Sequence, residues 1–179
     1  MIYTNSELYN DNEVMRYKNK IMNYLIANSD EKLSKALYEL LLNQECTNIE
    51  LCENLLWKNI VPELFVDGTV TETQAYILFD IDIKANSRID TYNNITLYFH
   101  ILSHKSIVNV KNIGTRCDSI VSILCKIFKD KIFYSDGAIG IGKNHKTTDR
   151  VLSSPNNNYV ARELIFTITD FDERVKNKI

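Results

Sequence analysis

The segment from Gly137 to Lys143 has the spacing of a phosphate-binding loop, with Gly, four further residues and then Gly-Lys. Such a loop also needs a Ser or Thr for magnesium after the lysine, and a helix whose N terminus faces the phosphates. Asn144 stands at the Ser/Thr position, and the residues after it have no amphipathic helical pattern. We interpret the segment as a glycine turn or short hairpin, and we expect no cofactor.

Histidines and cysteines are the next candidates for chemistry, because both ligate metals. His100 and His104 are four residues apart, which on a helix could bring both to one ion. The surrounding alternation predicts a strand, on which they share a face but lie too far apart to chelate one ion. No Cys-x-x-Cys pair occurs among the four cysteines, which we interpret as reduced core residues. They are Cys46, Cys52, Cys117 and Cys125. We expect no metal.

Three aspartates suggest a magnesium-dependent nuclease, which needs clustered carboxylates. Asp80 and Asp82 share one face of a predicted strand, and Asp90 follows. No Glu-x-Lys follows at the usual place on a neighbouring strand, and carboxylates are common on the wet face of a sheet. A hydrolytic triad is not indicated either, because the chain has no Gly-x-Ser-x-Gly elbow. We expect no enzyme, and a small metal-dependent nuclease stays open as an alternative.

The elements that must position these residues include three strands. Residues 76–84, 95–102 and 162–170 alternate apolar and polar side chains with a period of two, which is typical of strands with one buried face. The polar connection 85–94 has about the length of a hairpin loop, so the first two strands should be antiparallel. These patterns predict a sheet that is covered on one side and used on the other.

Helical periodicity runs through residues 11–25 and 29–41, and we expect these two helices to pack as an antiparallel pair. A brief helix over 48–57 should end before Pro62. We expect Trp57 to anchor this region by burial.

The best-specified helix follows the capping box Thr115-Arg-Cys-Asp118. One side of this helix is apolar, through Cys117, Ile120, Val121, Leu124, Ile127 and Phe128. The polar stretch from Asn144 to Asn158 is expected to be a mobile loop, or one that becomes ordered on a partner.

The chain has 179 residues and fits a single domain over 1–179. We predict an α+β fold, with a mainly helical part over 1–65 and a sheet plus a central helix over 75–172. The sheet should be small, antiparallel or mixed, with about four strands. The net charge of −2 disfavours a primary DNA-binding protein. No secretory signal or membrane-spanning run is recognisable, so we expect synthesis in a reducing cytoplasm and no membrane partner.

Charged side chains are candidates for a subunit or partner interface. The locally basic cluster near the last strand could meet acids of a neighbouring copy, with Arg150 and Arg162 opposite Asp80 or Asp82. The predicted interface residues are Asp80, Asp82, Arg116, Asp118, Lys143, Lys146, Arg150 and Arg162.

Four segments taken together resemble the neck proteins of tailed bacteriophages, and most of all the tail terminator type. They are residues 95–104, 114–124, 139–143 and 159–171. The likeness lies in the order of elements, in the Arg-x-Asp helix start at Arg116, and in the Ala-Arg-x-Leu-x-Phe strand that begins at Ala161.

The resemblance implies a virion protein, made in the host bacterial cytoplasm, that forms a sixfold homo-oligomeric ring on the end of the tail tube. Its partners would be itself, the tail tube protein and the head connector or stopper proteins, with DNA passing through the channel without sequence-specific binding. No catalytic residues carry over from such a family. A head-tail connector or head-completion protein, and a regulatory or anti-defence binding module, are further alternatives.

Overall fold

The computed structural model describes residues 13–26, 31–45, 55–64, 72–85, 92–111, 114–128, 145–152 and 158–171. Five strands form one mixed sheet in the order β1-β2-β3-β7-β6, in which only β1 and β2 are parallel. Their bounds are β1 Ile60–Val61, β2 Ala75–Ala85, β3 Tyr92–His104, β6 His145–Leu152 and β7 Tyr159–Phe171. The predicted α+β class is confirmed.

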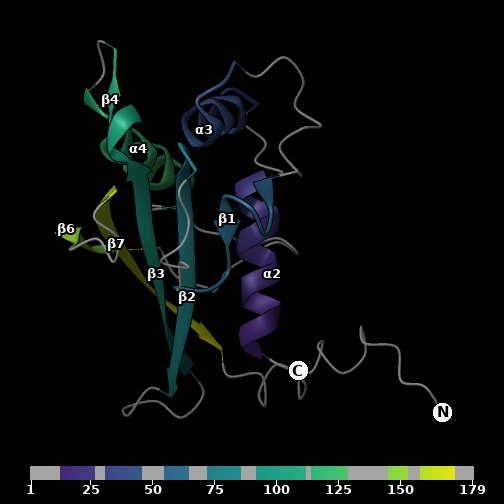
Figure 1. Ribbon diagram of the computed structural model, residues 1–179. Helices are drawn as coiled ribbons and strands as arrows, with labels where there is room; N and C mark the ends of the chain where they lie inside the picture. The colour runs from purple at the N-terminus through teal and green to yellow at the C-terminus, as the bar shows by residue number, and fades with distance from the viewer. Residues whose placement is uncertain are drawn as a thin grey trace.

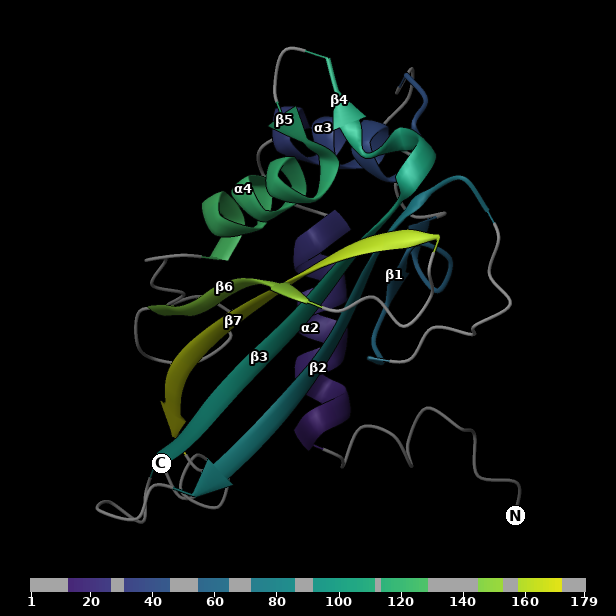
Figure 2. The ribbon, with the colours of Figure 1, turned by 60° about the vertical axis from the view of Figure 1, so that its left-hand side comes forward.

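Three helices lie together on one face of this sheet, within the described part of the chain (Figures 1 and 2). They are α2 (Glu13–Ile26), α3 (Glu31–Leu42) and α4 (Arg116–Phe128). A short 3-10 turn, η2 (Lys105–Ile107), and a two-stranded ribbon of β4 (Asn109–Val110) and β5 (Gly114–Thr115) connect β3 to α4. Gly114 has φ +117°, a conformation that other residues rarely adopt, so the ribbon needs glycine there.

The main core lies between the helices and the covered face of the sheet. The strands contribute Ile77, Phe79, Ile81, Ile95, Leu97, Phe99, Ile101, Leu164, Phe166 and Ile168. The side of α4 that was predicted to be apolar is buried against them. The Phe99 ring lies with its centroid 5.3 Å from that of Phe128 and 6.1 Å from that of Phe166. The period-two pattern therefore predicted the covered face correctly.

The face without described helices has a small apolar cluster of its own at one end of the sheet. It contains Tyr76, Leu78, Leu102, Tyr159 and Ala161. Two of these residues also bond to Glu72, since the Tyr159 hydroxyl donates to its carbonyl at 2.6 Å and the Tyr76 hydroxyl lies 3.5 Å from its carboxylate. Desolvation raises the pKa of both tyrosines. This end of the second face is therefore packed, which the alternation did not reveal.

Two predictions about the N-terminal half are wrong. The first two helices do not form an antiparallel pair: α2 lies against β2, whereas α3 lies beside α4 (Figure 1). Trp57 is 60% exposed, although Ile60, three residues later, is fully buried. Residues 46–54, which hold most of the predicted short helix, lie outside the described residues, as do Cys46 and Cys52.

The prediction of a loop from Asn144 to Asn158 is also wrong for residues 145–152. These residues form strand β6, which pairs antiparallel with β7. A strand at a sheet margin bonds to one neighbour only, and charged residues are common there. The pairing is irregular between Lys146 and Thr148, where Thr147 donates its hydroxyl to the Ile165 carbonyl at 3.2 Å. β6 thus lacks the apolar alternation by which the other strands were predicted.

Arg116 connects α4 to α3. Its guanidinium donates to the Leu40 carbonyl at 2.6 Å, to the Ile107 carbonyl at 2.8 Å and to the Asn43 side-chain oxygen at 2.6 Å. Asn43 follows the last residue of α3 with φ 56°, the left-handed conformation that commonly ends a helix. Only 5% of Arg116 is exposed, and this desolvation lowers its pKa. Within one chain, Arg116 is therefore a structural tie.

We predict that Arg116→Met lowers the free energy of unfolding by about 2–4 kcal/mol, because it leaves buried acceptors without donors. Urea denaturation of the purified chain measures the change. The control is Lys126→Met, at an exposed position of the same helix, which should change stability by less than about 0.5 kcal/mol. Equal effects of the two substitutions would contradict this role for Arg116.

Candidate functional site

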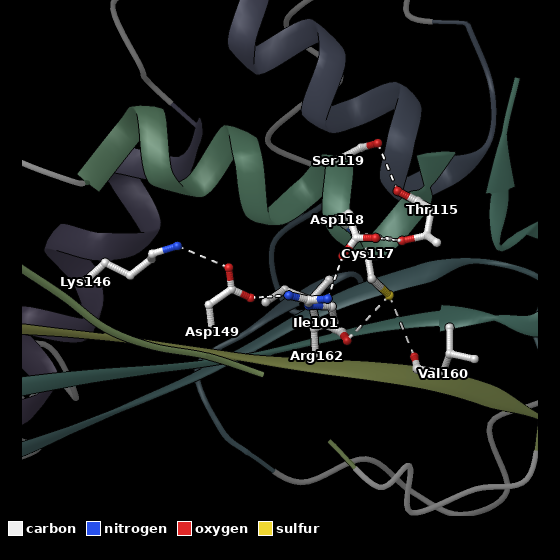
Figure 3. Close-up of polar contacts among 9 residues, drawn as sticks. All are labelled: Ile101, Thr115, Cys117, Asp118, Ser119, Lys146, Asp149, Val160 and Arg162. Carbon is white, nitrogen blue, oxygen red and sulfur yellow. Dashed lines mark hydrogen bonds and ion pairs between the residues drawn. The ribbon is translucent and has the colours of Figure 1, made fainter. Parts of the chain in front are cut away.

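The start of α4 aims a carboxylate at the sheet. The Thr115 hydroxyl accepts a hydrogen bond from the Asp118 backbone N–H at 3.1 Å and donates to the Asp118 carboxylate. The Ser119 hydroxyl donates to the Thr115 carbonyl at 2.9 Å. The predicted capping box is therefore confirmed, and it fixes Asp118 above β7 (Figure 3).

Four charged residues meet where α4 faces the β6–β7 margin, and we call them the Arg162 cluster: Asp118, Lys146, Asp149 and Arg162. Arg162 Nη1 lies 2.9 Å from Asp118 Oδ1, while Nη2 bonds to Asp149 Oδ1. Lys146 Nζ lies 3.1 Å from the other oxygen of Asp149. Figure 3 shows this chain of contacts running from β6 through β7 to the first turn of α4. The cluster joins three elements that are distant in the sequence.

The electrostatics of the cluster favour its charged form. Burial by itself would raise the pKa of Asp149, but hydrogen bonds from Arg162 and Lys146 outweigh burial and lower the pKa below its usual value. The hydrogen bond to Asp149 likewise raises the pKa of Arg162. The paired charges fix the relative positions of α4, β6 and β7.

Cys117 lies next to this cluster in sequence but is not reactive. Its thiol is buried and donates long contacts of 3.8 Å to the Ile101 and Val160 carbonyls (Figure 3). Desolvation raises the pKa of the thiol to about 12. The thiolate that a nucleophile or a metal ligand requires is therefore disfavoured.

A second charged row lies on the opposite face of the sheet. His100, Glu163 and Arg150 are register partners on β3, β7 and β6. Glu163 Oε1 lies 3.3 Å from His100 Nε2, and Glu163 Oε2 accepts from Arg150 Nε at 2.6 Å. The Glu163 side chain is only 9% exposed, so its carboxylate depends on these partners. Arg150 therefore belongs to this row and not to the Arg162 cluster.

The aspartates of β2 have partners of their own at the other margin of the sheet. Asp80 Oδ1 lies 2.8 Å from Lys18 Nζ, and Asp82 Oδ2 lies 2.7 Å from Lys84 Nζ. No three His, Cys, Asp or Glu side chains are grouped to hold a metal in the described part of the chain. Asp90 and the segment from Gly137 to Lys143 lie outside that part.

A groove of about 360 Å³ lies between α3 and α4. Its lining is Ala36, Glu39, Leu40, Val110, Arg116, Ser119, Ser122, Ile123 and Lys126. Arg116 in this lining is already bonded to α3 and η2, and the described lining contains no histidine or cysteine. Its size and mixed polarity are compatible with a small ligand, but no residues converge in it as a reacting set.

The structure thus separates the predicted interface residues into distinct places. It brings Asp118, Lys146 and Arg162 together and leaves Arg116, Arg150 and the two β2 aspartates elsewhere, while Lys143 lies outside the described residues. Sequence reasoning missed Asp149 and Glu163, which complete the two charged groups. Recognising β6 as a strand would have placed Asp149 and the Glu163 partner Arg150 beside β7.

Comparison with known proteins places the chain in a protein family. Residues 18–168 match a phage-type family model. This range includes α4 and every strand of the five-stranded sheet except the last residues of β7. The model is that of YomW, and the chain belongs to the YomW family. A search of the curated proteins finds no match.

The helices also bear on membrane association. Among the described residues, none of the helices is both long enough and apolar enough to span a membrane.

We predict that Asp149→Asn lowers the free energy of unfolding by about 1 kcal/mol at pH 7, because it removes the charge that Arg162 and Lys146 share. The lowered pKa of Asp149 means that its contribution is complete above the unfolded value of about 3.9 and is lost as the pH falls through the folded value. Wild type and variant should therefore converge in stability once the pH falls below the folded pKa of Asp149.

Thermal or urea unfolding between pH 7 and pH 2.5 measures both curves. The matched control is Asp82→Asn, because the Asp82–Lys84 pair is more exposed and should contribute little at pH 7. A difference between wild type and Asp149→Asn that is independent of pH would refute an electrostatic role for Asp149.

Proposed function

We propose that this chain is a structural virion protein of the phage neck, which caps the tail tube and joins tail to head as a homo-oligomeric ring. The observation that carries the proposal is a sheet whose described helices all cover one face, and whose margin strand β6 has no described strand beyond it. Membership of a phage-type family supports the phage context.

The physical basis of ring formation is that the sheet has two different margins. The strand order places β1 at one end of the sheet and β6 at the other. When one margin of a subunit binds the opposite margin of the next, the contact is heterologous, and its repetition gives a closed ring if the rotation between subunits closes. A sheet with an open margin favours this kind of association.

The described charged groups support a structural role. The Arg162 cluster, the His100–Glu163–Arg150 row and the β2 aspartates are all held in ion pairs. Groups held in this way fix the relative positions of the strands and helices that carry them. The proposed partners are further copies of the chain, the tail tube protein and a head connector or stopper protein. The net charge of −2 suits a channel through which DNA passes without being held.

The purified chain should form rings that bind one end of tail tubes. Light scattering should give a mass that is a fixed multiple of the subunit, and negative-stain electron microscopy should show rings alone and at tube ends. A chain that stays monomeric at high concentration, with tubes present, would count against the proposal.

Deleting the gene from its phage or prophage separates the tail terminator role from its alternatives. Loss of a terminator should give tails of uncontrolled length and filled heads without tails, and a plasmid copy should restore normal particles. Free tails of normal length would instead favour the head-tail connector or head-completion alternative.

A further inference from the structure

Trp57 is a large exposed aromatic side chain held in a strained backbone conformation. Its φ is 62°, which is unusual for a bulky residue, and 60% of its surface is exposed. The strain is not balanced by burial of the indole ring. Tryptophan is also the residue type most enriched where protein partners bind tightly.

The turn that presents Trp57 is firmly anchored. Leu55 and Ile60 on either side are buried, and the Asn59 N–H donates to the Leu55 carbonyl at 2.9 Å. The Asn59 side chain, which is 1% exposed, donates to the Ala75 carbonyl at 2.9 Å and so fixes the turn to β2. A buried frame thus holds an exposed ring in place, which is a preorganised contact surface.

Val151 is the counterpart of Trp57 at the other margin. It is 77% exposed, and these two are the exposed large hydrophobic residues among the described part of the chain. Trp57 lies beside β1 and Val151 lies on β6, the first and last strands of the sheet order. One exposed apolar residue at each end of a sheet suits a head-to-tail contact between copies.

The backbone of β6 adds hydrogen-bonding groups to this contact. In β2, the Ile77 and Ile81 N–H groups bond to Asn59 and to the Asp80 side chain, so they point away from β3. In an antiparallel strand, the N–H and C=O groups of one residue point to the same side, and this side alternates from each residue to the next.

This alternation can be followed through the register of β3 and β7 to β6. The backbone N–H and C=O groups of Arg150 then point toward β7, whereas those of Asp149 and Val151 point away from β7. The margin of β6 therefore offers backbone donors and acceptors beside an exposed valine.

The distal part of β2 is less suited to receive this margin. The Asp80 carboxylate bonds to the Ile81 N–H, and Lys18 lies against that carboxylate while also bonding to the Pro62 carbonyl. Charged groups at a strand edge oppose further pairing, and Lys146 and Asp149 have this effect on the first part of β6 as well, which leaves Val151 as the apolar part of that margin. The turn around Trp57 is thus the better receiving surface on this side of the sheet.

Charge also favours a second copy as the occupant. Arg150, whose side chain is 65% exposed although paired with Glu163, gives the β6 margin a positive charge on the face opposite Val151. Glu63, an exposed acid just after β1, supplies the opposite charge on the Trp57 side.

We propose that Trp57 of one copy packs on Val151 of the next, and that this contact is the seam between subunits. The proposal rests on the proposed ring function and names the surfaces that close it.

Trp57 is the single tryptophan of the chain, so intrinsic fluorescence reports directly on the seam. Wild-type protein should show an emission shift to shorter wavelength as concentration rises, in step with the mass from light scattering. Val151→Asp should abolish both changes, and Lys58→Ala, at an exposed position of the same turn, should retain both. Circular dichroism checks that each variant is folded.

The outcomes separate the seam from the ring function. A rise in mass without an emission shift would overturn the seam and leave the ring function standing. No rise in mass at any concentration, with tail tubes added, would count against the ring function itself.

Cysteine cross-linking provides a second, independent test. The double variant Trp57→Cys/Val151→Cys, treated with a bifunctional thiol reagent, should give a ladder of covalent multimers that exceeds the background of the wild type and its native cysteines. Each single variant should give no more than that background. Dimers formed by Val151→Cys alone would overturn the proposal in favour of a symmetric β6–β6 contact.

Discussion

Burial of one face of the sheet beneath α4 is the constraint on which the other features depend. The rings of Phe99, Phe128 and Phe166 meet at this boundary, and burying large apolar side chains is the main favourable contribution to folding. It sets the orientation of α4, and Arg116 at the start of the helix is then brought to the end of α3. The same orientation places Asp118 over Arg162. Packing and charge therefore act together at one end of a single helix.

The elements that could be predicted were those with a strong apolar period. β2, β3, β7 and α4 alternate or repeat because one side of each is buried, and α4 also starts with a Thr115 side chain that accepts from the Asp118 N–H. β6 could not be predicted because its partner lies on one side only, so it needs little apolar surface. The orientation of α2 and α3 was missed for another reason: periodicity shows that a helix has a buried side but not which element covers it.

The candidate site could be predicted only in part for the same reason. Asp118, Lys146 and Arg162 were recognised as charged interface residues, but their mutual contact depends on β6. Trp57 was expected to be buried because large apolar residues usually are. Its exposure depends on a positive φ in a tight turn, which no sequence period indicates. The two residues of the proposed seam, Trp57 and Val151, thus lie at the sheet margins, where sequence patterns are weakest.

The central claim is that copies of this chain meet at the margins of a sheet covered on one face. Amide hydrogen exchange, compared between the assembled protein and a dilute dissociated sample, tests it most directly. The account predicts that the Val151 amide exchanges slowly only in the assembly, whereas the Arg150 amide, which points toward β7, is protected in both samples. Fast exchange at Val151 in the assembled protein would contradict the claim.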